Sequence, residues 1–157
     1  MTDSLFAPPA LAYVATAEIE LEAPLDLGET PEGRRRIVPI AGGRVDGPEL
    51  TGTVVRGGAD WQRVLPDGTT LVEARYTLRL DDGELVSLLS KGIRTGPPEV
   101  LAALARGEQL DQSQYVFRLS IRARTASPAY RWLNTSLLLA TAERRPDAVR
   151  YDLYRVT

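Results

Sequence analysis

Alternating apolar and polar residues run along most of the chain and predict an all-β fold. In residues 11–21 the odd positions are apolar, whereas Thr16, Glu18 and Glu20 occupy the other face. Successive side chains of a β-strand point to opposite faces, so this segment is expected to be a half-buried strand. Similar patterns predict further strands over residues 35–40, 50–56, 61–65, 70–80, 84–90, 115–124, 130–134, 136–143 and 149–156.

Turn-forming residues separate these segments. Gly57-Gly58 allows a bend or bulge, and Pro66-Asp67-Gly68 and Asp81-Asp82-Gly83 have the composition of tight hairpin turns. The acidic, Pro- and Gly-rich residues 25–33 are expected to form a loop. Residues 97–106 place apolar residues at helical spacing and predict one short helix.

These elements predict a single antiparallel β-barrel, closed or nearly closed, of about eight to ten strands with one short α-helix, because closure removes exposed sheet edges. The 157 residues suit one domain spanning residues 1–157. Residues 1–10, which include Pro8 and Pro9, are expected to be a loosely ordered N-terminal extension.

The composition restricts the chemistry. The chain contains no Cys and no His, which removes thiol nucleophiles, imidazole bases and most transition-metal sites. The acidic residues alternate along strands or lie in turns, so no metal site is expected. Asp, Glu, Tyr, Arg, an amide or a bound cofactor must carry any catalysis, and the catalytic hypothesis below needs no cofactor.

Charge and hydropathy bear on partners and location. The formal net charge of -2 offers no general attraction to nucleic acid or anionic lipid. The N-terminus does not resemble a secretory signal, and no apolar run is long enough to cross a membrane. We therefore expect a cytoplasmic protein without nucleic-acid or membrane partners. A homodimer is compatible with the sequence.

Asp60 and Trp61 form the first candidate site. They follow Gly57-Gly58, so a flexible turn is followed by a carboxyl group and a large aromatic ring. A carboxyl group held against apolar surface has a raised pKa and becomes a useful proton shuttle near neutral pH. The structural alternative is a turn Asp that caps backbone N–H groups, with Trp61 in the core.

A second candidate site is the segment around residues 130–134. Tyr130 and Trp132 are expected on one strand face, and the amide of Asn134 both donates and accepts hydrogen bonds. Anchoring of the core and stacking on a ligand remain equally compatible with this pattern.

Two strands divide into an apolar and a charged face. Tyr76 lies on the apolar face of residues 71–80, opposite Glu73 and Arg75, and Arg118 lies on the charged face of residues 115–124. The simplest interpretation exposes the charged faces to solvent. A ligand-binding barrel, however, places a few charged groups inward near its mouth.

The order of these motifs resembles the domain of unknown function 3237 family, also called uncharacterised protein family 0311, over nearly the whole chain. The motifs that carry the resemblance are residues 37–43, 57–61, 73–78 with 81–83, 92–98, 130 with 132–134, and 151–156. The resemblance implies a calycin-like antiparallel barrel with a central cavity, and it implies no general activity.

The chain departs from the family pattern in two places. Ala123 and Arg124 stand where an aromatic and an acidic residue are expected, and residues 88–90, with Leu89 at their centre, are less polar than usual. We expect both departures to alter the lining of the cavity, which favours a specialised pocket, for example in secondary metabolism.

We therefore weigh three hypotheses. The first is a cofactor-independent lyase, isomerase, hydratase or cyclase that acts on a small organic molecule by acid–base chemistry. Its catalytic residues are Asp60, Arg75, Tyr130 and Asn134, and its substrate-binding residues are Trp61, Glu73, Tyr76, Arg118 and Trp132. The second is a non-catalytic barrel that carries or senses a small apolar or aromatic ligand. The third is an interaction module with a filled interior.

Overall fold

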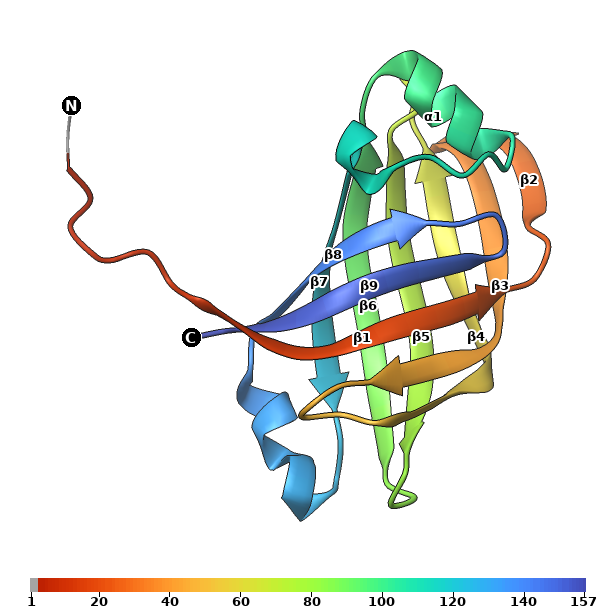
Figure 1. Cartoon of the computed structure of the whole chain (residues 1–157). Coiled ribbons are helices and arrows are strands. Elements are labelled where there is room, and N and C mark those ends of the chain that lie inside the picture. Colours follow the sequence, from red (N-terminus) through yellow and green to blue (C-terminus); the bar gives the residue numbers. More distant parts are fainter. Residues whose placement is uncertain (1–2) are drawn as a thin grey trace.

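The computed structural model describes residues 3–157 and forms a closed antiparallel β-barrel of eight strands with one additional strand (Figure 1). The strands are β1 (Leu11–Leu21), β2 (Leu25–Thr30), β3 (Gly33–Asp46), β4 (Gly52–Val64), β5 (Thr70–Leu80), β6 (Leu85–Thr95), β7 (Val116–Arg124), β8 (Leu138–Arg144) and β9 (Ala148–Val156). One α-helix, α1 (Pro98–Ala105), and two 3-10 segments, Gln112–Gln114 and Pro128–Thr135, lie between strands. The predicted all-β barrel is confirmed.

Closure depends on β1, which pairs with β9 on one side and with β3 on the other. Strands β3 to β9 follow one another as antiparallel neighbours, so hairpin connections suffice. Strand β2 pairs with β3 alone and extends the wall at one end. The barrel therefore has few free strand edges, as the expectation of closure required.

The two ends of the barrel are covered differently. Helix α1 lies across one end, beside β2, and the 3-10 segment Pro128–Thr135 lies at the opposite end (Figure 1). Pro98 opens α1, where its missing N–H costs nothing, and Leu101 and Leu104 are buried. We call the end beneath α1 the mouth.

The end opposite the mouth is filled by side chains. Leu133 from the 3-10 segment is fully buried there, and it packs with the inward rows of several strands. Only about 10 Å³ of space remains among the residues Ala15, Ala17, Val45, Leu50, Leu78, Val86, Leu88, Ala123, Leu133, Leu138, Tyr151 and Leu153. Any ligand site inside the barrel must therefore lie toward the mouth.

Two sequence-based assignments are wrong. Residues 25–30 form β2 rather than a loop, because β3 is longer than expected and offers them a pairing edge. Residues 130–134 belong to a 3-10 segment rather than a strand, and Pro128 stands in its first turn. The segments predicted over 50–56 and 61–65 join into the single strand β4, with a register shift between Val55 and Ala59.

Glycines make this irregularity possible. Gly57 has a φ of +120°, which residues with a Cβ rarely adopt. Between Val55 and Ala59, β4 advances by two residues more than β5 does. After the irregularity, Asp60 is opposite Ala74, a residue of the inward row of β5.

Residues 3–10 precede β1 without a helix or strand and extend away from the barrel (Figure 1). Their side chains are exposed. Ala10 joins the barrel through backbone hydrogen bonds with Thr157.

Candidate functional site at the mouth of the barrel

Three arginines line the interior of the barrel near the mouth. Arg36 on β3 has the same orientation as the buried Val38 and Ile40, because alternate residues of a strand share a face. In the same way, Arg94 continues the inward row of β6 and Arg144 that of β8. Each of these rows is largely apolar until it ends in an arginine, so we call the three residues the arginine layer.

Asp60 is the carboxyl group next to this layer. Its Oδ2 accepts a hydrogen bond from Nε2 of Gln62 at 2.7 Å, and its Oδ1 accepts one from the backbone N–H of Glu73 at 3.1 Å. Oε1 of Gln62 in turn accepts a hydrogen bond from Nη2 of Arg36 at 2.9 Å. The buried Gln62 thus links the carboxyl group to the arginine layer and holds both in place.

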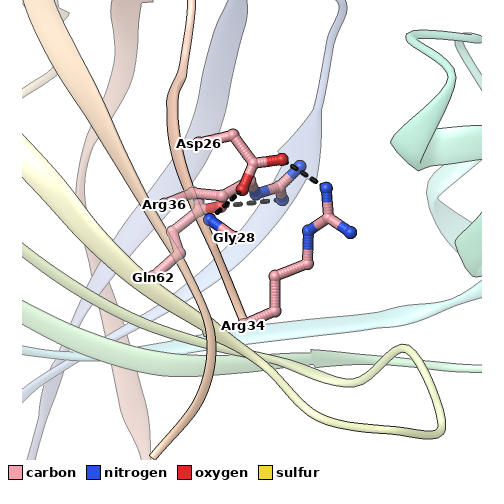
Figure 2. A network of polar contacts seen from close by, with 5 residues as sticks. All are labelled: Asp26, Gly28, Arg34, Arg36 and Gln62. Carbon is pink, nitrogen blue, oxygen red and sulfur yellow. Dashed lines mark hydrogen bonds and ion pairs between the residues drawn. The ribbon is translucent and has the colours of Figure 1, made fainter. Parts of the chain in front are cut away.

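Strand β2 adds a second carboxylate at the rim. Figure 2 shows Asp26 accepting a hydrogen bond from the backbone N–H of Gly28 and pairing with Arg34, while Arg36 turns to Gln62. Asp26 is thereby committed to Arg34. The carboxylate of Asp26 forms no ion pair with Arg36 and affects the pKa of Arg36 only as one of several nearby charges.

Arg94 is the most deeply buried member of the layer, with 5% of its surface exposed. Its guanidinium lies over the ring of Phe117, 5.2 Å from the ring centroid. Within residues 3–157, Nη1 of Arg94, Nη1 of Arg144 and Nε of Arg36 are buried without a hydrogen-bond partner. Such donors are uncommon in folded proteins and call for an explanation.

The environment shifts the ionisation of these groups. Burial raises the pKa of Asp60 above its ordinary value, although Gln62 and Arg94 oppose this shift. Burial lowers the pKa of Arg94 to about 10, and repulsion from Arg144 and Arg36 adds to the effect. The arginine layer thus holds several like charges close together; Asp60 is a carboxyl neighbour of all three arginines, and Asp26 is a further one of Arg36.

Two spaces adjoin the arginine layer. On the outer side, a cavity of about 600 Å³ is lined by Asp26, Arg34, Arg36, Val64, Pro66, Asp67, Gly68, Thr70, Arg94, Pro98, Leu101, Ala102 and Ala105. We call it the mouth cavity. On the inner side, an apolar cavity of about 40 Å³ is lined by Ile19, Leu21, Ile40, Asp60, Val72, Ala74, Tyr76, Ser90, Phe117, Leu119, Val149 and Tyr151. Asp60 therefore belongs to the inner cavity, and Arg36 and Arg94 belong to the mouth cavity.

Tyr76 and Tyr151 face each other in the inner cavity. Their hydroxyl oxygens lie 2.6 Å apart and are hydrogen-bonded. Burial raises the pKa of Tyr151 to about 12 and that of Tyr76 well above its ordinary value. Both hydroxyls are thus neutral near pH 7, and because one of them donates to the other, one O–H remains free to donate.

Of the residues proposed from the sequence, Asp60 and Tyr76 lie in the interior, and four others lie on the outer wall. Trp61 is 40% exposed and Glu73 pairs with Arg75, whose side chain is 67% exposed. Arg118 is exposed on β7. Adjacent residues of a strand point to opposite faces, so Trp61 cannot share the lumen with Asp60, and Arg75 cannot share it with Tyr76. The expectation that Asp60 and Arg75 face one cavity is wrong.

The other three proposed residues lie at the filled end. The ring of Trp132 lies under the guanidinium of Arg155, at 4.9 Å. The side chain of Asn134 accepts a hydrogen bond from the N–H of Thr125 and donates one to its carbonyl, both at 2.9 Å. Tyr130 and Trp132 pack against the edge of the hydrophobic core. The structure does not bring these residues to Asp60.

The departures from the family pattern also lie away from the mouth. Ala123 is fully buried in the filled end, whereas Arg124 is exposed and donates to backbone carbonyls of Ala123 and Asn134. Leu89 is opposite Arg122, on the outward row of β7. None of these three residues lines the mouth cavity or the inner cavity, whereas Ser90, the last residue of the segment 88–90, lines the inner cavity.

Sequence reasoning missed Arg36, Arg94, Arg144 and Gln62. The alternation pattern held one signal for Arg94 and Arg144. Each stands at an even-numbered position, as do the buried residues that precede it on the inward face of its strand. Strand ends often emerge into solvent, so this signal has little weight without the closed barrel.

No helix of the described chain is long and apolar enough to cross a membrane. In the same residues, no three side chains of the His, Cys, Asp or Glu type gather as a metal site would require.

Comparison with known proteins identifies the family. The model of the family "Protein of unknown function (DUF3237)" matches residues 9–156. Relatives named UPF0311 proteins occur in Clostridium acetobutylicum, 37% identical over 145 residues, and in Bradyrhizobium diazoefficiens, 40% identical over 144 residues. The matches cover 92% of this chain in both cases, and 92% and 94% of the respective relatives.

Solved structures agree. A conserved protein of unknown function from Rhodopseudomonas palustris superposes with a TM-score of 0.94 at 37% identity, over 97% of this chain and 100% of that one. A beta-barrel like protein from Acinetobacter baumannii gives 0.86 at 38% identity, over 99% and 100%. An enzyme from Penicillium herquei gives 0.74 at 18% identity, over 99% and 100%, which shows a shared fold. On these matches the chain belongs to the DUF3237 family of proteins of unknown function.

Proposed function

We propose that this protein is a cofactor-independent enzyme that performs acid–base chemistry on a small organic molecule inside the barrel. Asp60 is the general acid or base. The supporting observation is its position: a carboxyl group with a raised pKa lies in the wall of an apolar cavity, held by Gln62 and a backbone N–H. Lyase, isomerase, hydratase and cyclase reactions share this requirement for proton transfer.

The proposed step balances without a second reagent. The carboxylate of Asp60 removes a proton from an acidic C–H or O–H bond of the substrate, and the electron pair of that bond moves into the substrate. The resulting carboxylic acid returns the proton to another atom of the same molecule. A raised pKa brings Asp60 closer to the operating pH, which favours both directions of transfer.

Tyr76 and Tyr151 are suited to assist. Their raised pKa values keep both hydroxyls protonated, so the one that does not donate to its neighbour can donate to an oxygen of the substrate where negative charge develops. A barrel of the same fold is an enzyme in Penicillium herquei, which makes the fold compatible with catalysis and assigns no reaction.

The alternative is a non-catalytic barrel that carries or senses the same kind of ligand. A cavity of about 600 Å³ that adjoins buried arginines suits binding as well as catalysis. This alternative differs from the proposed enzyme in one respect: Asp60 transfers no proton.

Hydrogen–deuterium exchange separates the two. Phenylpyruvate and the neutral ketone 1-indanone have acidic C–H bonds whose exchange in D₂O is followed by ¹H NMR. We expect the wild-type protein to accelerate exchange in a probe that it binds, and Asp60→Asn to slow it by about 10²-fold or more. Binding to Asp60→Asn should stay close to that of the wild type.

The exposed Asp46→Asn variant is the matched control for the loss of one carboxylate. Equal exchange rates in wild type and Asp60→Asn overturn the role of Asp60. Binding of the probes without any acceleration supports the carrier or sensor and overturns the enzyme.

A further inference from the structure

The arginine layer carries more positive charge than the folded chain neutralises. Its three guanidinium groups adjoin one buried carboxyl group, Asp60. Among residues 3–157, no ion pair within 4.0 Å includes Arg36, Arg94 or Arg144. The excess charge stays inside the molecule, where water screens it poorly.

The other carboxylates near the mouth are committed elsewhere. Asp26 pairs with Arg34, and Asp67 accepts a hydrogen bond from the backbone N–H of Thr69 in the β4–β5 turn. Asp147 acts on Arg144 only as a distant charge. None of these three carboxylates forms an ion pair with Arg94.

Buried donors remain unused at the same place. Arg94 is 5% exposed, and its Nη1 has no partner in the described chain, as is true of Nε of Arg36. Buried N–H groups almost always find an acceptor. Both arginines line the mouth cavity, so an acceptor that enters this cavity lies beside their side chains.

The mouth cavity also has an apolar part. Beside the charged Asp26, Arg34 and Asp67, its lining includes Val64, Pro66, Pro98, Leu101, Ala102 and Ala105, and about 600 Å³ is ample for an aromatic or polycyclic acid. The planar fork of a guanidinium matches the two oxygens of a carboxylate. The Phe117 ring lies 5.2 Å from the guanidinium carbon of Arg94 and gives it an aromatic neighbour.

We infer that the mouth cavity binds an organic acid whose carboxylate is received by Arg36 and Arg94 and whose apolar body lies beneath α1. This inference rests on the proposed function and names its substrate class. Arg144 lines neither cavity but adds to the positive potential. Gln62 joins Arg36 to Asp60 by hydrogen bonds and so connects this carboxylate site to the proposed acid or base.

Matched acids and amides test the inference without any variant. Isothermal titration calorimetry compares benzoate, trans-cinnamate and 2-naphthoate with benzamide, cinnamamide and 2-naphthamide. We expect each acid to bind about tenfold or more tightly than its amide, and affinity to rise with the size of the apolar body. Inorganic phosphate that binds as tightly as 2-naphthoate overturns the organic acid in favour of a simple anion.

The variants Arg94→Met and Arg36→Met test whether these two arginines cause the preference for acids over amides. Both variants should bind the acid and the amide with similar affinity, while amide binding stays at the wild-type level. Arg122→Met, on the exposed outer face of β7, is the matched control and should keep the preference for acids. Selectivity that survives in both mouth variants overturns the assignment.

The binding experiment can fail independently of the exchange experiment that tests Asp60. Equal affinity of wild type for acids and amides overturns the organic acid and leaves the exchange experiment with neutral 1-indanone valid. A preference for acids together with undiminished exchange in Asp60→Asn overturns the role of Asp60 alone.

Discussion

The hydroxyl oxygens of Tyr76 and Tyr151 lie 2.6 Å apart inside the barrel, although 75 positions separate the two residues in the chain. Strand β5 supplies one and β9 the other, so closure of the barrel creates the pair. Both residues are buried at the inner cavity, and each hydroxyl depends on the other for a buried partner.

Removal of one hydroxyl should cost more than removal of both. Tyr151→Phe leaves the hydroxyl of Tyr76 buried without this partner, so we expect the free energy of unfolding to fall by about 1–3 kcal/mol. The double variant Tyr76→Phe/Tyr151→Phe should recover much of this loss. Urea denaturation of the wild type, both single variants and the double variant gives the coupling, and strictly additive losses would contradict the prediction.

Asp60 should make the protein less stable as the pH rises. Burial raises the pKa of Asp60 in the folded state above its ordinary value of 3.8, so the folded state disfavours the carboxylate. The neutral carboxyl group therefore contributes its full stabilisation below about pH 3.8, and this stabilisation is lost as the pH rises through the pKa of Asp60 in the folded state.

The Asp60→Asn variant has no carboxyl group at this position, so it does not lose stability by ionisation there. We expect its free energy of unfolding, relative to the wild type, to increase between about pH 4 and pH 7. Urea denaturation at several pH values measures the difference, and Asp46→Asn corrects for the change in net charge. A relative stability that falls over this range would show that Asp60 is favoured as the carboxylate in the fold.

Arg94 is expected to lower the stability of the ligand-free protein. Replacement by Met removes a buried charge and an unpartnered donor and keeps a long side chain that can pack on Phe117. We expect the free energy of unfolding of the ligand-free protein to rise by about 1–3 kcal/mol. Arg122→Met, at the surface, should change it by less than about 0.5 kcal/mol. Strong destabilisation by Arg94→Met, measured by urea denaturation, would identify Arg94 as a structural anchor instead.

Gly92 marks a close approach of β6 to β7. A Cβ at this position would lie 2.2 Å from the carbonyl oxygen of Arg118 and 2.6 Å from Cδ2 of Leu119. Gly92→Ala should therefore lower the free energy of unfolding by about 1–3 kcal/mol or more through overpacking. At Gly42 a Cβ would meet ordinary contacts of 3.6 Å or longer, so Gly42→Ala is the control. Equal thermal stability of the two variants would contradict this explanation.

Local patterns were enough to predict much of the barrel. The strand expected over residues 11–21 is β1 with the same bounds, and that over 70–80 is β5. Alternation over most of each strand reports burial of one face, although a register shift between Tyr13 and Ala15 interrupts it in β1. Strand β2 and the 3-10 segment at residues 128–135 were missed because their conformations depend on partners that are distant in the sequence.

The candidate site was predicted in part. The sequence singled out Asp60 and Tyr76, and both lie in the interior, but it also grouped them with Trp61 and Arg75, which lie on the outer wall. Alternation tells which residues share a face. It does not tell which charged residues at strand ends turn inward.

By itself, the sequence determined an antiparallel barrel without His or Cys and placed a carboxyl group after a glycine-rich bend. Only the tertiary structure decided that Arg36, Arg94 and Arg144 come close enough to repel one another, because closure of the barrel brings together the ends of β3, β6 and β8. A solvent-exposed arginine and a buried one have the same place in a strand pattern. They differ in whether the rest of the fold removes water from around them.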